Sequence, residues 1–434
     1  MPQRLDASAI GFEDAFSAFL QAKRDTEVAA DQVSADIVAA VRAQGDEALF
    51  AYNHRFDRFR IGRDTVRIKQ EEIEEAVRSV PADLLSALNL AASRIRAFHE
   101  RQMPAVLDYQ DSSGVTLGMR WTPLDSVGVY VPGGLAAYPS SVLMNVIPAK
   151  VAGVGRIAMV FPTPDGTLNP AVLAAASAAG VDEIYRIGGA QAVAALAYGT
   201  ESVPAVDKIV GPGNAYVTAA KRIVFGRVGI DTIAGPSEVL VVAEPGQAPP
   251  EWLAADLLAQ AEHDEAAQSI LISPDGALLE DTATAVERTL EQLPRAAIAA
   301  ASWRDHGALI HVPNLEAAVP LVDAIAPEHL QLVLADNRAF ANRVRHAGAI
   351  FLGAFTPEAV GDYVGGTNHV LPTDRSARFA SGLSLFDFMK RTTILGCDPQ
   401  SLSEIGPAAV TLANAEGLDA HALSVALRLS LIHI

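Results

Sequence analysis

The sequence predicts an α/β protein built on two parallel sheets. Short apolar runs, such as residues 156–161 and 269–273, have the length of strands and alternate with helical stretches. Nearly continuous apolar strands separated by helices indicate a parallel sheet covered on both faces. The alternation fills residues 126–243 and again 250–352. We therefore expect two Rossmann-like parallel-sheet domains with small helical N- and C-terminal segments.

Composition narrows the class of protein. Half of the 434 residues are hydrophobic and only 19% are charged, which excludes general disorder. With 33 basic and 51 acidic residues, the net charge of −18 argues against nucleic acid as the main partner. The longest uncharged run, 126–149, is broken by three prolines, so we expect no membrane span.

The single cysteine and the N-terminus favour a soluble cytoplasmic protein. Cys397 cannot form an intramolecular disulfide, and no basic segment followed by an apolar run opens the chain. Cys397 follows an apolar run without a basic neighbour. A buried, inert thiol is therefore favoured over a nucleophile.

The N-terminal part predicts helices. Phe12, Phe16, Phe19 and Leu20 share one face of a helix over 12–24, and this stripe is favoured as a core or subunit contact over a ligand site. Further helices are expected at 33–43, from Asp46, and at 71–101 with a break at Pro81, and 59–69 alternates like a hairpin.

Two α/β units follow. The first has expected strands at 115–119, 126–131, 156–161, 183–187, 208–210 and 236–243, a Pro-Gly-Gly turn at 132–134, and helices at 169–179, 192–198 and 215–225. The second has helices at 250–261, 279–292 and 315–325, and strands at 269–273, 307–312 and 348–352. Apolar segments at 386–389 and 393–395 precede two C-terminal helices, 399–414 and 418–430. Right-handed crossovers would bring the strand-to-helix turns of each unit to one sheet edge, where small molecules bind.

Glu328 and His329 form the first candidate for chemistry. Pro327 disfavours helix at Ala326, so a turn is expected there, and neighbouring side chains of a turn can enter one cleft. A histidine can accept a proton near neutral pH, and the adjacent glutamate can orient it or activate a water. For an isolated pair, a solvated surface turn is the favoured interpretation.

The glycine-rich turns leave two interpretations open. No Gly-x-Gly-x-x-Gly stands at a strand-to-helix turn, so a dinucleotide fingerprint is missing. Residues 188–189 and 211–213 nevertheless lie where backbone turns sharply or approaches a ligand closely. Packing and a nucleotide cradle are about equally favoured.

Several polar side chains suit a metal. Gln260 and His263 share a helix face, Asp362 and His369 flank a Gly-Gly loop, and His421 lies on the last helix. Such an N/O set suits zinc or manganese with positions open for substrate. The alternative is a polar helix end and dispersed surface residues, because spacing does not bring distant residues together.

Collinear motifs nevertheless identify a family. These are SVGVYVPGG (126–134), IGGAQAVAALAYGT (187–200), KIVGPGNAYV (208–217), IAGPSE (233–238), AQAEHD (259–264), APEHLQL (326–332), GDYVGGTNHVLPT (361–373), FMKRTT (388–393) and AEGLDAH (415–421). Over essentially its whole length the chain resembles the histidinol dehydrogenase family. The resemblance implies two NAD⁺-dependent oxidations, from L-histidinol through L-histidinal to L-histidine, at the end of histidine biosynthesis.

The resemblance also implies residue roles. One Zn²⁺ per subunit would be held by Gln260, His263, Asp362 and His421. NAD contacts would come from Tyr130, Gln191 and Asn214. Substrate contacts would come from the metal ligands and from Ser237, His329, His369 and Glu416. His329 would accept the alcohol proton, and Glu328 would activate the water that attacks the aldehyde. In a homodimer with exchanged C-terminal segments, Glu416 and His421 would serve the partner subunit's site.

The expected domains follow from the resemblance and the α/β rhythm. They are an N-terminal helical arm (1–25), a discontinuous first α/β domain (26–129 and 239–381), an NAD-binding second domain (130–238) and a helical dimerisation segment (382–434). The alternatives are a related dehydrogenase of another small polar alcohol such as a sulfonated diol, a zinc hydrolase, and a non-enzymatic scaffold.

Overall fold

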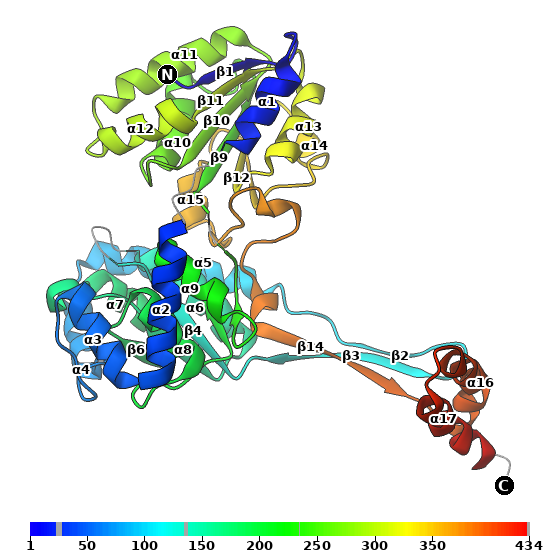
Figure 1. Ribbon diagram of the computed structural model, residues 1–434. Coiled ribbons are helices and arrows are strands. Elements are labelled where there is room, and N and C mark those ends of the chain that lie inside the picture. Colours follow the sequence, from blue (N-terminus) through cyan, green and yellow to red (C-terminus); the bar gives the residue numbers. More distant parts are fainter. Residues whose placement is uncertain (23–27, 134–137, 234, 432–434) are drawn as a thin grey trace.

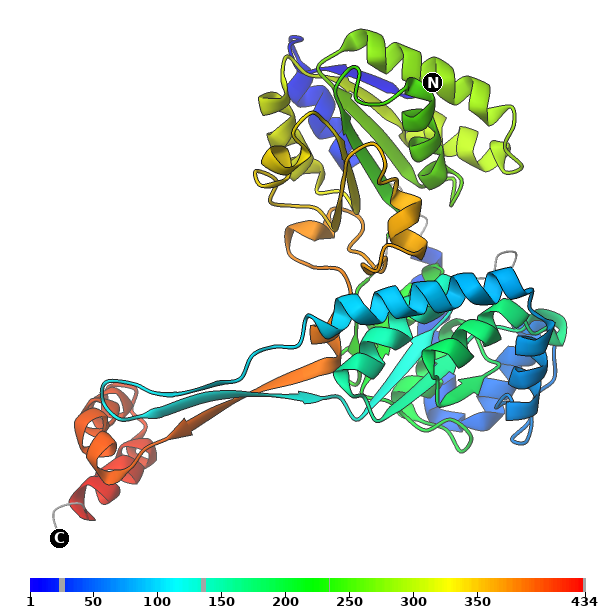
Figure 2. The ribbon, with the colours of Figure 1, turned by 180° about the vertical axis from the view of Figure 1, so that it is seen from behind.

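The computed structural model describes residues 1–22, 28–133, 138–233 and 235–431. These residues form two α/β lobes, and an arm leaves the second lobe and ends in a pair of helices (Figure 1). Seen from behind, the arm extends clear of both lobes (Figure 2). The predicted fold class is confirmed, because each lobe is built on a parallel sheet.

The first lobe contains the six-stranded sheet A, in the order β1-β11-β10-β9-β12-β13. Its strands are β1 (Gln3–Asp6), β9 (Glu238–Ala243), β10 (Gln268–Ser273), β11 (Ala308–His311), β12 (His329–Val333) and β13 (Ala349–Leu352). One face is covered by α1 (Phe12–Gln21), α13 (Leu315–Ile325) and α14 (Asn337–Ala341), the other by α10 (Pro250–Ala261), α11 (Gly276–Leu290) and α12 (Ala296–His306). Successive residues of β9, such as Leu240 and Val241, belong to the cores on opposite faces, as the apolar strands predicted.

The second lobe contains the five-stranded sheet B, in the order β6-β5-β4-β7-β8. Its strands are β4 (Ser126–Tyr130), β5 (Arg156–Val160), β6 (Glu183–Tyr185), β7 (Lys208–Val210) and β8 (Gly229–Ile230). One face is covered by α4 (Gln70–Ser79), α5 (Ala82–Glu100), α6 (Pro139–Ala152) and α7 (Pro170–Ala179), the other by α2 (Val28–Gln44), α3 (Asp46–Asp57), α8 (Gly189–Tyr198) and α9 (Ala215–Val224). From a central strand, β4 in sheet B and β9 in sheet A (where β1 precedes it at the edge), the chain moves outward and later crosses to the other side of that strand. Such a crossing makes a switch point at which α/β sheets bind ligands.

The arm is a three-stranded antiparallel ribbon, which the sequence did not predict. It consists of β2 (Leu107–Gln110), β3 (Thr116–Pro123) and β14 (Met389–Gly396), and it leads to α16 (Pro399–Ala415) and α17 (Asp419–Leu431). The strand expected at 115–119 is present as part of the central strand of this ribbon, not in the parallel sheet of the α/β unit to which the sequence assigned it. The two C-terminal helices were predicted. The ribbon carries them away from α15 (Glu358–Tyr363), which lies between the lobes (Figure 1). Short 3₁₀ turns complete the fold: η1 (Pro164–Gly166), η2 (Ser376–Arg378) and η3 (Leu385–Phe388).

The predicted hairpin at 59–69 is wrong. The end of this segment runs along the edge of sheet B, where Ile68 N–H donates to Ile184 O at 2.8 Å and Arg186 N–H donates to Val66 O at 2.9 Å. Alternation of apolar residues describes a half-buried extended segment, and it does not say which edge that segment meets.

Other differences concern which elements exist and which sheet they meet. The N-terminal segment, expected to be a helical arm, begins with β1, which pairs with β11 in sheet A. Helix α12 and strand β12 are present in the structure but were not predicted. The sequence grouped 26–129 with the first α/β domain, whereas α2 to α5 pack against sheet B. An amphipathic pattern identifies the buried face of a helix but not its partner. Cys397, expected to be buried, is exposed at the end of the ribbon.

The Pro-Gly-Gly turn lies partly outside the described residues, since Gly134 is not among them. No helix in the described ranges combines the length and apolar character needed to cross a bilayer.

Candidate active site

A cavity of about 370 Å³ is lined by residues of both lobes. The carboxyl edge of sheet B supplies the turn after β7, and the amino edge of sheet A supplies residues at the starts of β9 and β12. Seven residues predicted from the sequence line it together: Ser237, Gln260, His263, Glu328, His329, Asp362 and His369.

A change of backbone direction brings Glu328 and His329 into this cavity. Helix α13 ends at Ala326, which adopts a left-handed conformation with φ 49°, and Pro327 prevents the helix from continuing. The predicted turn is therefore present through Glu328. His329, however, is already the first residue of β12 and pairs with Val239 and Ala349. Both side chains line the cavity because the strand starts at its wall.

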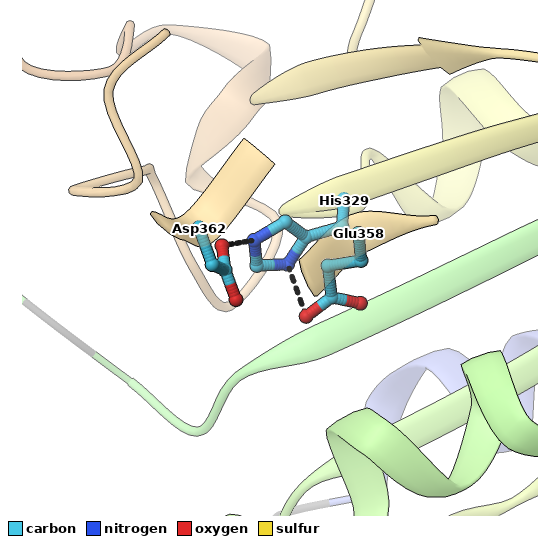
Figure 3. Close-up of side chains that lie close together, drawn as sticks. All are labelled: His329, Glu358 and Asp362. Carbon is cyan, nitrogen blue, oxygen red and sulfur yellow. Dashed lines mark ion pairs between the residues drawn. The ribbon is translucent and has the colours of Figure 1, made fainter. Parts of the chain in front are cut away.

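The surroundings of His329 leave one ring nitrogen available. Its Nδ1 lies 3.0 Å from the backbone oxygen of Glu238, so Nδ1–H donates to that carbonyl. Nε2 is buried without a hydrogen-bond partner among the described residues, 3.7 Å from Oδ1 of Asp362 (Figure 3). A neutral imidazole held in this tautomer has its lone pair on Nε2, where it can accept a proton.

Glu328 is a buried carboxyl group close to the imidazole. Its Oε2 accepts the Glu238 N–H at 3.0 Å and lies 3.7 Å from His329 Nδ1. Burial raises the pKa of Glu328 to about 7, although the neighbouring His329 opposes the shift. A carboxyl group with such a pKa can accept and release a proton near neutral pH.

Glu358 is a site residue that the sequence analysis missed. It opens α15 directly after Pro357, and its Oε1 lies 3.7 Å from His329 Nδ1 (Figure 3). Its Oε2 is buried without a partner in the described residues, and burial raises the pKa of Glu358 to about 8. The available signal was its spacing from Asp362, because residues four apart share one helix face.

The buried acids act on the imidazole together. Burial by itself lowers the pKa of His329, but Glu358, Glu328 and Asp362 outweigh it and hold that pKa well above its usual value. Burial likewise opposes ionisation of Asp362, yet His329 lowers its pKa overall. An imidazolium formed at this position is therefore stabilised by three surrounding acids.

Among the described histidines, cysteines and acids, the group with ligand atoms within 4.8 Å of one another is His329, Glu358 and Asp362. It shares only Asp362 with the ligand set implied by the resemblance. Two of the other implied ligands nevertheless have free donor atoms. Gln260 is buried with Oε1 unpartnered among the described atoms, and His263 bonds through Nδ1 to Ala259 O at 2.9 Å, which leaves Nε2. A backbone carbonyl that fixes the far nitrogen is typical of a metal-binding histidine.

A second cavity, of about 780 Å³, lies at the carboxyl edge of sheet B and includes Tyr130, Gln191 and Asn214. Tyr130 Oη accepts the N–H of Gly189 at 3.0 Å, and Gln191 has a buried Oε1 with no partner among the described residues. Asn214 caps α9 by accepting the Val217 N–H at 3.2 Å. Free side-chain polar atoms at helix starts on this edge suit a dinucleotide.

A buried ion pair holds the turn between the two cavities. Lys221 and Asp231 pair with each other, and both line the smaller cavity. Lys221 Nζ also donates to Gly211 O at 3.1 Å, while Asp231 Oδ2 accepts the Gly211 N–H at 2.7 Å. The sequence analysis did not identify this pair, since a Lys and an Asp ten residues apart form no recognisable motif.

Two predicted residues do not reach the cavity of their own chain. Glu416 caps the end of α16 and His421 lies in α17, both exposed at the far end of the arm (Figures 1 and 2). The structure of one subunit therefore brings together three of the four implied metal ligands.

Known proteins match the chain over almost its full length. The histidinol dehydrogenase family model matches residues 20–429. Histidinol dehydrogenases of Gluconobacter oxydans and Rhodospirillum rubrum are 61% and 60% identical, over 98% and 99% of this chain and 99% of each relative. The crystal structure of histidinol dehydrogenase from Elizabethkingia anophelis is similar with a TM-score of 0.95 and 36% identity, covering 100% of this chain and 99% of that one. The chain therefore belongs to the histidinol dehydrogenase family of oxidoreductases.

Proposed function

We propose that the protein oxidises L-histidinol through L-histidinal to L-histidine with two molecules of NAD⁺, in the cytoplasm. One observation carries the proposal: the acid–base pair and three metal-type donors line a cavity next to a dinucleotide-type cavity. One cavity of this kind could serve both oxidations. Its metal-type donors would retain the aldehyde, and its acid–base pair would accept protons from the alcohol and from water.

The donor atoms fit one metal ion. Gln260, His263 and Asp362, with His421 of the partner subunit, would hold Zn²⁺, a mixed N/O set that this ion accepts. Bound there, the ion would supply a Lewis acid for nitrogen donors of the substrate and so would help these residues to position it. Ser237 and His369 line the same cavity and would contact substrate, and His369 has Nδ1 fixed by Asp362 O at 3.0 Å.

The proton transfers follow from the positions of two side chains. His329 accepts the hydroxyl proton at Nε2 in each oxidation, because Glu238 O holds the ring in that tautomer. Glu328 accepts a proton from the water that attacks the aldehyde, and Glu358 stabilises the charged ring. Tyr130, Gln191 and Asn214 would hold NAD⁺ in the 130–238 domain, where it would supply the hydride acceptor for each step.

Dimerisation through residues 382–434 would complete the site. Large apolar side chains are exposed at the arm tip, among them Leu412, Leu423 and Leu427. Others are exposed in α10 and α15, which carry Gln260 and Asp362, and in the turn before α15, namely Trp252, Tyr363 and Phe355. Exposed apolar sets of this kind mark interaction surfaces. Docking of one on the other would deliver Glu416 and His421 to the partner's cavity, where Glu416 would contact the substrate.

The activity is tested with purified, zinc-loaded protein. L-Histidinol and NAD⁺ should give two NADH and one histidine per histidinol, and a sulfonated diol should give neither. Absence of NADH from histidinol would refute the proposal. Turnover of another polar alcohol, or hydrolysis of an ester without NAD⁺, would favour the corresponding alternative.

Mixing two inactive variants tests the shared site. His421→Ala and His263→Ala homodimers should each be inactive, and subunit exchange should restore about a quarter of wild-type turnover, because half of the dimers then have one intact site. If His421 served its own subunit, no mixed dimer would contain an intact site and activity would not return.

A further inference from the structure

Helix α5 contacts a loop that carries two of the residues predicted to meet the substrate. Asp362 and His369 stand at the two ends of this loop, the 362–369 loop, and both line the smaller cavity. The loop begins in α15, between the lobes, whereas α5 packs against sheet B in the second lobe (Figures 1 and 2). The residue roles implied by the resemblance include none in α5, so its contacts with the loop have no role assigned to them.

Arg94 of α5 binds the loop backbone at two successive carbonyl groups. Its Nε donates to Val364 O at 2.5 Å, and its Nη2 donates to Gly365 O at 3.1 Å. A guanidinium presents its donors in a rigid planar fork, so two such bonds fix both the position and the direction of the backbone that accepts them. Arg94 therefore holds the chain two and three residues beyond Asp362.

The loop backbone lies close enough to α5 to require a glycine. Gly366 has φ +100°, and a Cβ added to it would lie 3.0 Å from Arg94 O. The same segment also bonds back to α15, because Gly365 N–H donates to Val360 O at 2.6 Å. Helices α5 and α15 thus hold one short segment between them.

A buried histidine of α5 contacts the far end of the loop. Burial lowers the pKa of His99, so the ring is neutral, and its Nδ1–H donates to Gln102 Oε1 at 2.8 Å. Its Nε2 then accepts a weak hydrogen bond from Asn368 Nδ2 at 3.5 Å. Asn368 directly precedes His369 in the chain.

Stronger hydrogen bonds fix Asn368 itself. Its Nδ2 donates to Met144 O at 2.6 Å, and its Oδ1 accepts the Val370 N–H at 2.9 Å. Met144 lies in α6, another helix of the second lobe. The second lobe therefore anchors the loop at both ends, through Arg94 of α5 and through Asn368.

We propose that Arg94 is a positioning residue of the active site: by holding the 364–365 backbone on the second lobe, it sets where the Asp362 carboxylate stands in the cavity. The inference rests on the proposed metal and substrate site, in which Asp362 is a ligand. Glu328 and His329 stand where β12 begins, outside the loop. Loss of Arg94 should therefore weaken metal and substrate binding more than it slows proton transfer, because a ligand is displaced while the bases stay in place.

Zinc binding to the full-length protein, measured by competition with a chromophoric chelator, tests the inference without turnover. Arg94→Ala should bind Zn²⁺ about tenfold more weakly than wild type, the lower end of the range for groups that hold a metal ligand in place, because Arg94 bonds the neighbouring backbone and not the ligand itself. Arg101→Ala removes an exposed arginine from the end of the same helix and should bind Zn²⁺ as wild type does.

Kinetics of the zinc-saturated enzyme give a second measurement. Arg94→Ala should raise KM for histidinol about tenfold and keep kcat within about threefold of wild type, the pattern of lost binding that ground state and transition state share. Binding of ADP-ribose, which is NAD⁺ without its nicotinamide, should not change, because the loop is separate from the described lining of the larger cavity.

Added guanidinium distinguishes positioning from a general loss of structure. Arg94 is exposed, so its truncation leaves a gap that a small cation can enter from solvent. Guanidinium ion at millimolar concentration, far below denaturing concentrations, should restore zinc affinity to Arg94→Ala and leave wild type and Arg101→Ala unchanged. Arg94→Lys keeps the charge but not the fork, and its zinc affinity should fall between those of wild type and Arg94→Ala.

Several outcomes would overturn the inference. These are a zinc affinity and KM of Arg94→Ala equal to those of wild type, an equal loss in Arg101→Ala, a loss confined to kcat, or a loss that guanidinium does not reverse. If Arg94→Ala did not fold, wild-type zinc affinity in Arg94→Lys would count against the inference. Failure of the proposed reaction is separate, because wild-type protein would then form no NADH from histidinol, whereas the inference concerns differences among variants.

Discussion

Replacing Glu328 by glutamine separates the two oxidations. The amide keeps the size of the side chain, and its oxygen can still accept the Glu238 N–H that Glu328 accepts at 3.0 Å. What disappears is the ability to take a proton from water. In the proposed mechanism the first oxidation needs His329 and not Glu328, so Glu328→Gln should slow the aldehyde step far more than the alcohol step.

The kinetic effect has a known range. A positioned general base contributes about 10²- to 10⁴-fold, and oxidation of histidinal should fall by that factor. Because the pKa of Glu328 is raised to about 7, the wild-type aldehyde step should require the carboxylate and weaken as pH falls below 7. The variant should lose the part of this dependence that Glu328 causes, because an amide at position 328 does not titrate, whereas His329 and Glu358 keep their own titrations.

Although Glu328→Gln should slow the aldehyde step, it should raise the stability of the folded protein at alkaline pH. A carboxyl group whose pKa rises from 4.5 to about 7 on folding binds protons more tightly in the folded state. Its contribution is therefore fully present below pH 4.5 and is lost as pH rises through 7. At about 1.4 kcal/mol per tenfold in proton affinity, the difference at pH 8 approaches roughly 3 kcal/mol. Glu328→Gln removes the cost of ionising a buried carboxyl group and should raise the unfolding free energy at pH 8 by up to that amount.

The assay measures both consequences on one protein. Stopped-flow NADH formation from histidinal and from histidinol gives the two rates, and NADH per histidinol should fall from two towards one while a carbonyl trap captures aldehyde. Urea unfolding at pH 5 and pH 8 gives the stability. Histidinal oxidation within tenfold of wild type would refute the role of Glu328, and a variant both slower and less stable at pH 8 would point to structural damage instead.

Three further changes test other parts of the structure. Burial raises the pKa of Asp256 to about 6, although Gln331 donates to it at 2.7 Å. Asp256→Asn should therefore raise the unfolding free energy at pH 8 by up to about 3 kcal/mol in urea unfolding and leave turnover unchanged. Gly211 has φ +108°, and a Cβ added to it would lie 2.1 Å from Tyr130 O, so Gly211→Ala should lower the unfolding free energy by about 3 kcal/mol or more. Gly226 has φ +96° but no atom within 4 Å of an added Cβ, so the control Gly226→Ala should lower it by only about 1 kcal/mol. Removing the metal with a chelator should weaken histidinol binding about tenfold or more in calorimetry and leave ADP-ribose binding within about twofold, because the two ligands occupy separate cavities.

Much of the fold could be predicted because apolar periodicity reports burial directly. Strands such as β5, β9 and β10 are buried on both faces, and their uninterrupted apolar runs gave their type and nearly their ends. β1 escaped prediction because only one of its four residues, Leu5, is buried. The antiparallel ribbon escaped for the same reason, since β14 contains mostly exposed residues and its pairing with β3 joins segments far apart in sequence.

For the candidate site, the sequence indicated which residues take part but not that they lie together. Motifs supplied Gln260, His263, Glu328, His329 and Asp362 by resemblance, and the fold brings these residues to one cavity. Spacing alone could not have done so, because their convergence depends on where helices and strands end in space.

The geometry also qualifies the rule that ligands bind at the carboxyl edges of parallel strands. Sheet B follows the rule, with Tyr130 at the end of β4 and Gly211 directly after β7. Sheet A does not, because Glu238 and His329 are the first residues of β9 and β12. The proposed hydride acceptor and the proposed proton acceptors would therefore belong to opposite edges of two different sheets. Their separation depends on how the lobes are joined, and Gly235 N–H, which donates to Thr373 Oγ1 at 2.6 Å, ties the two connecting segments at that junction. In the proposed mechanism this junction sets the distance between the hydride-accepting face of the cofactor and the base, so one arrangement of the two lobes would have to serve both oxidations.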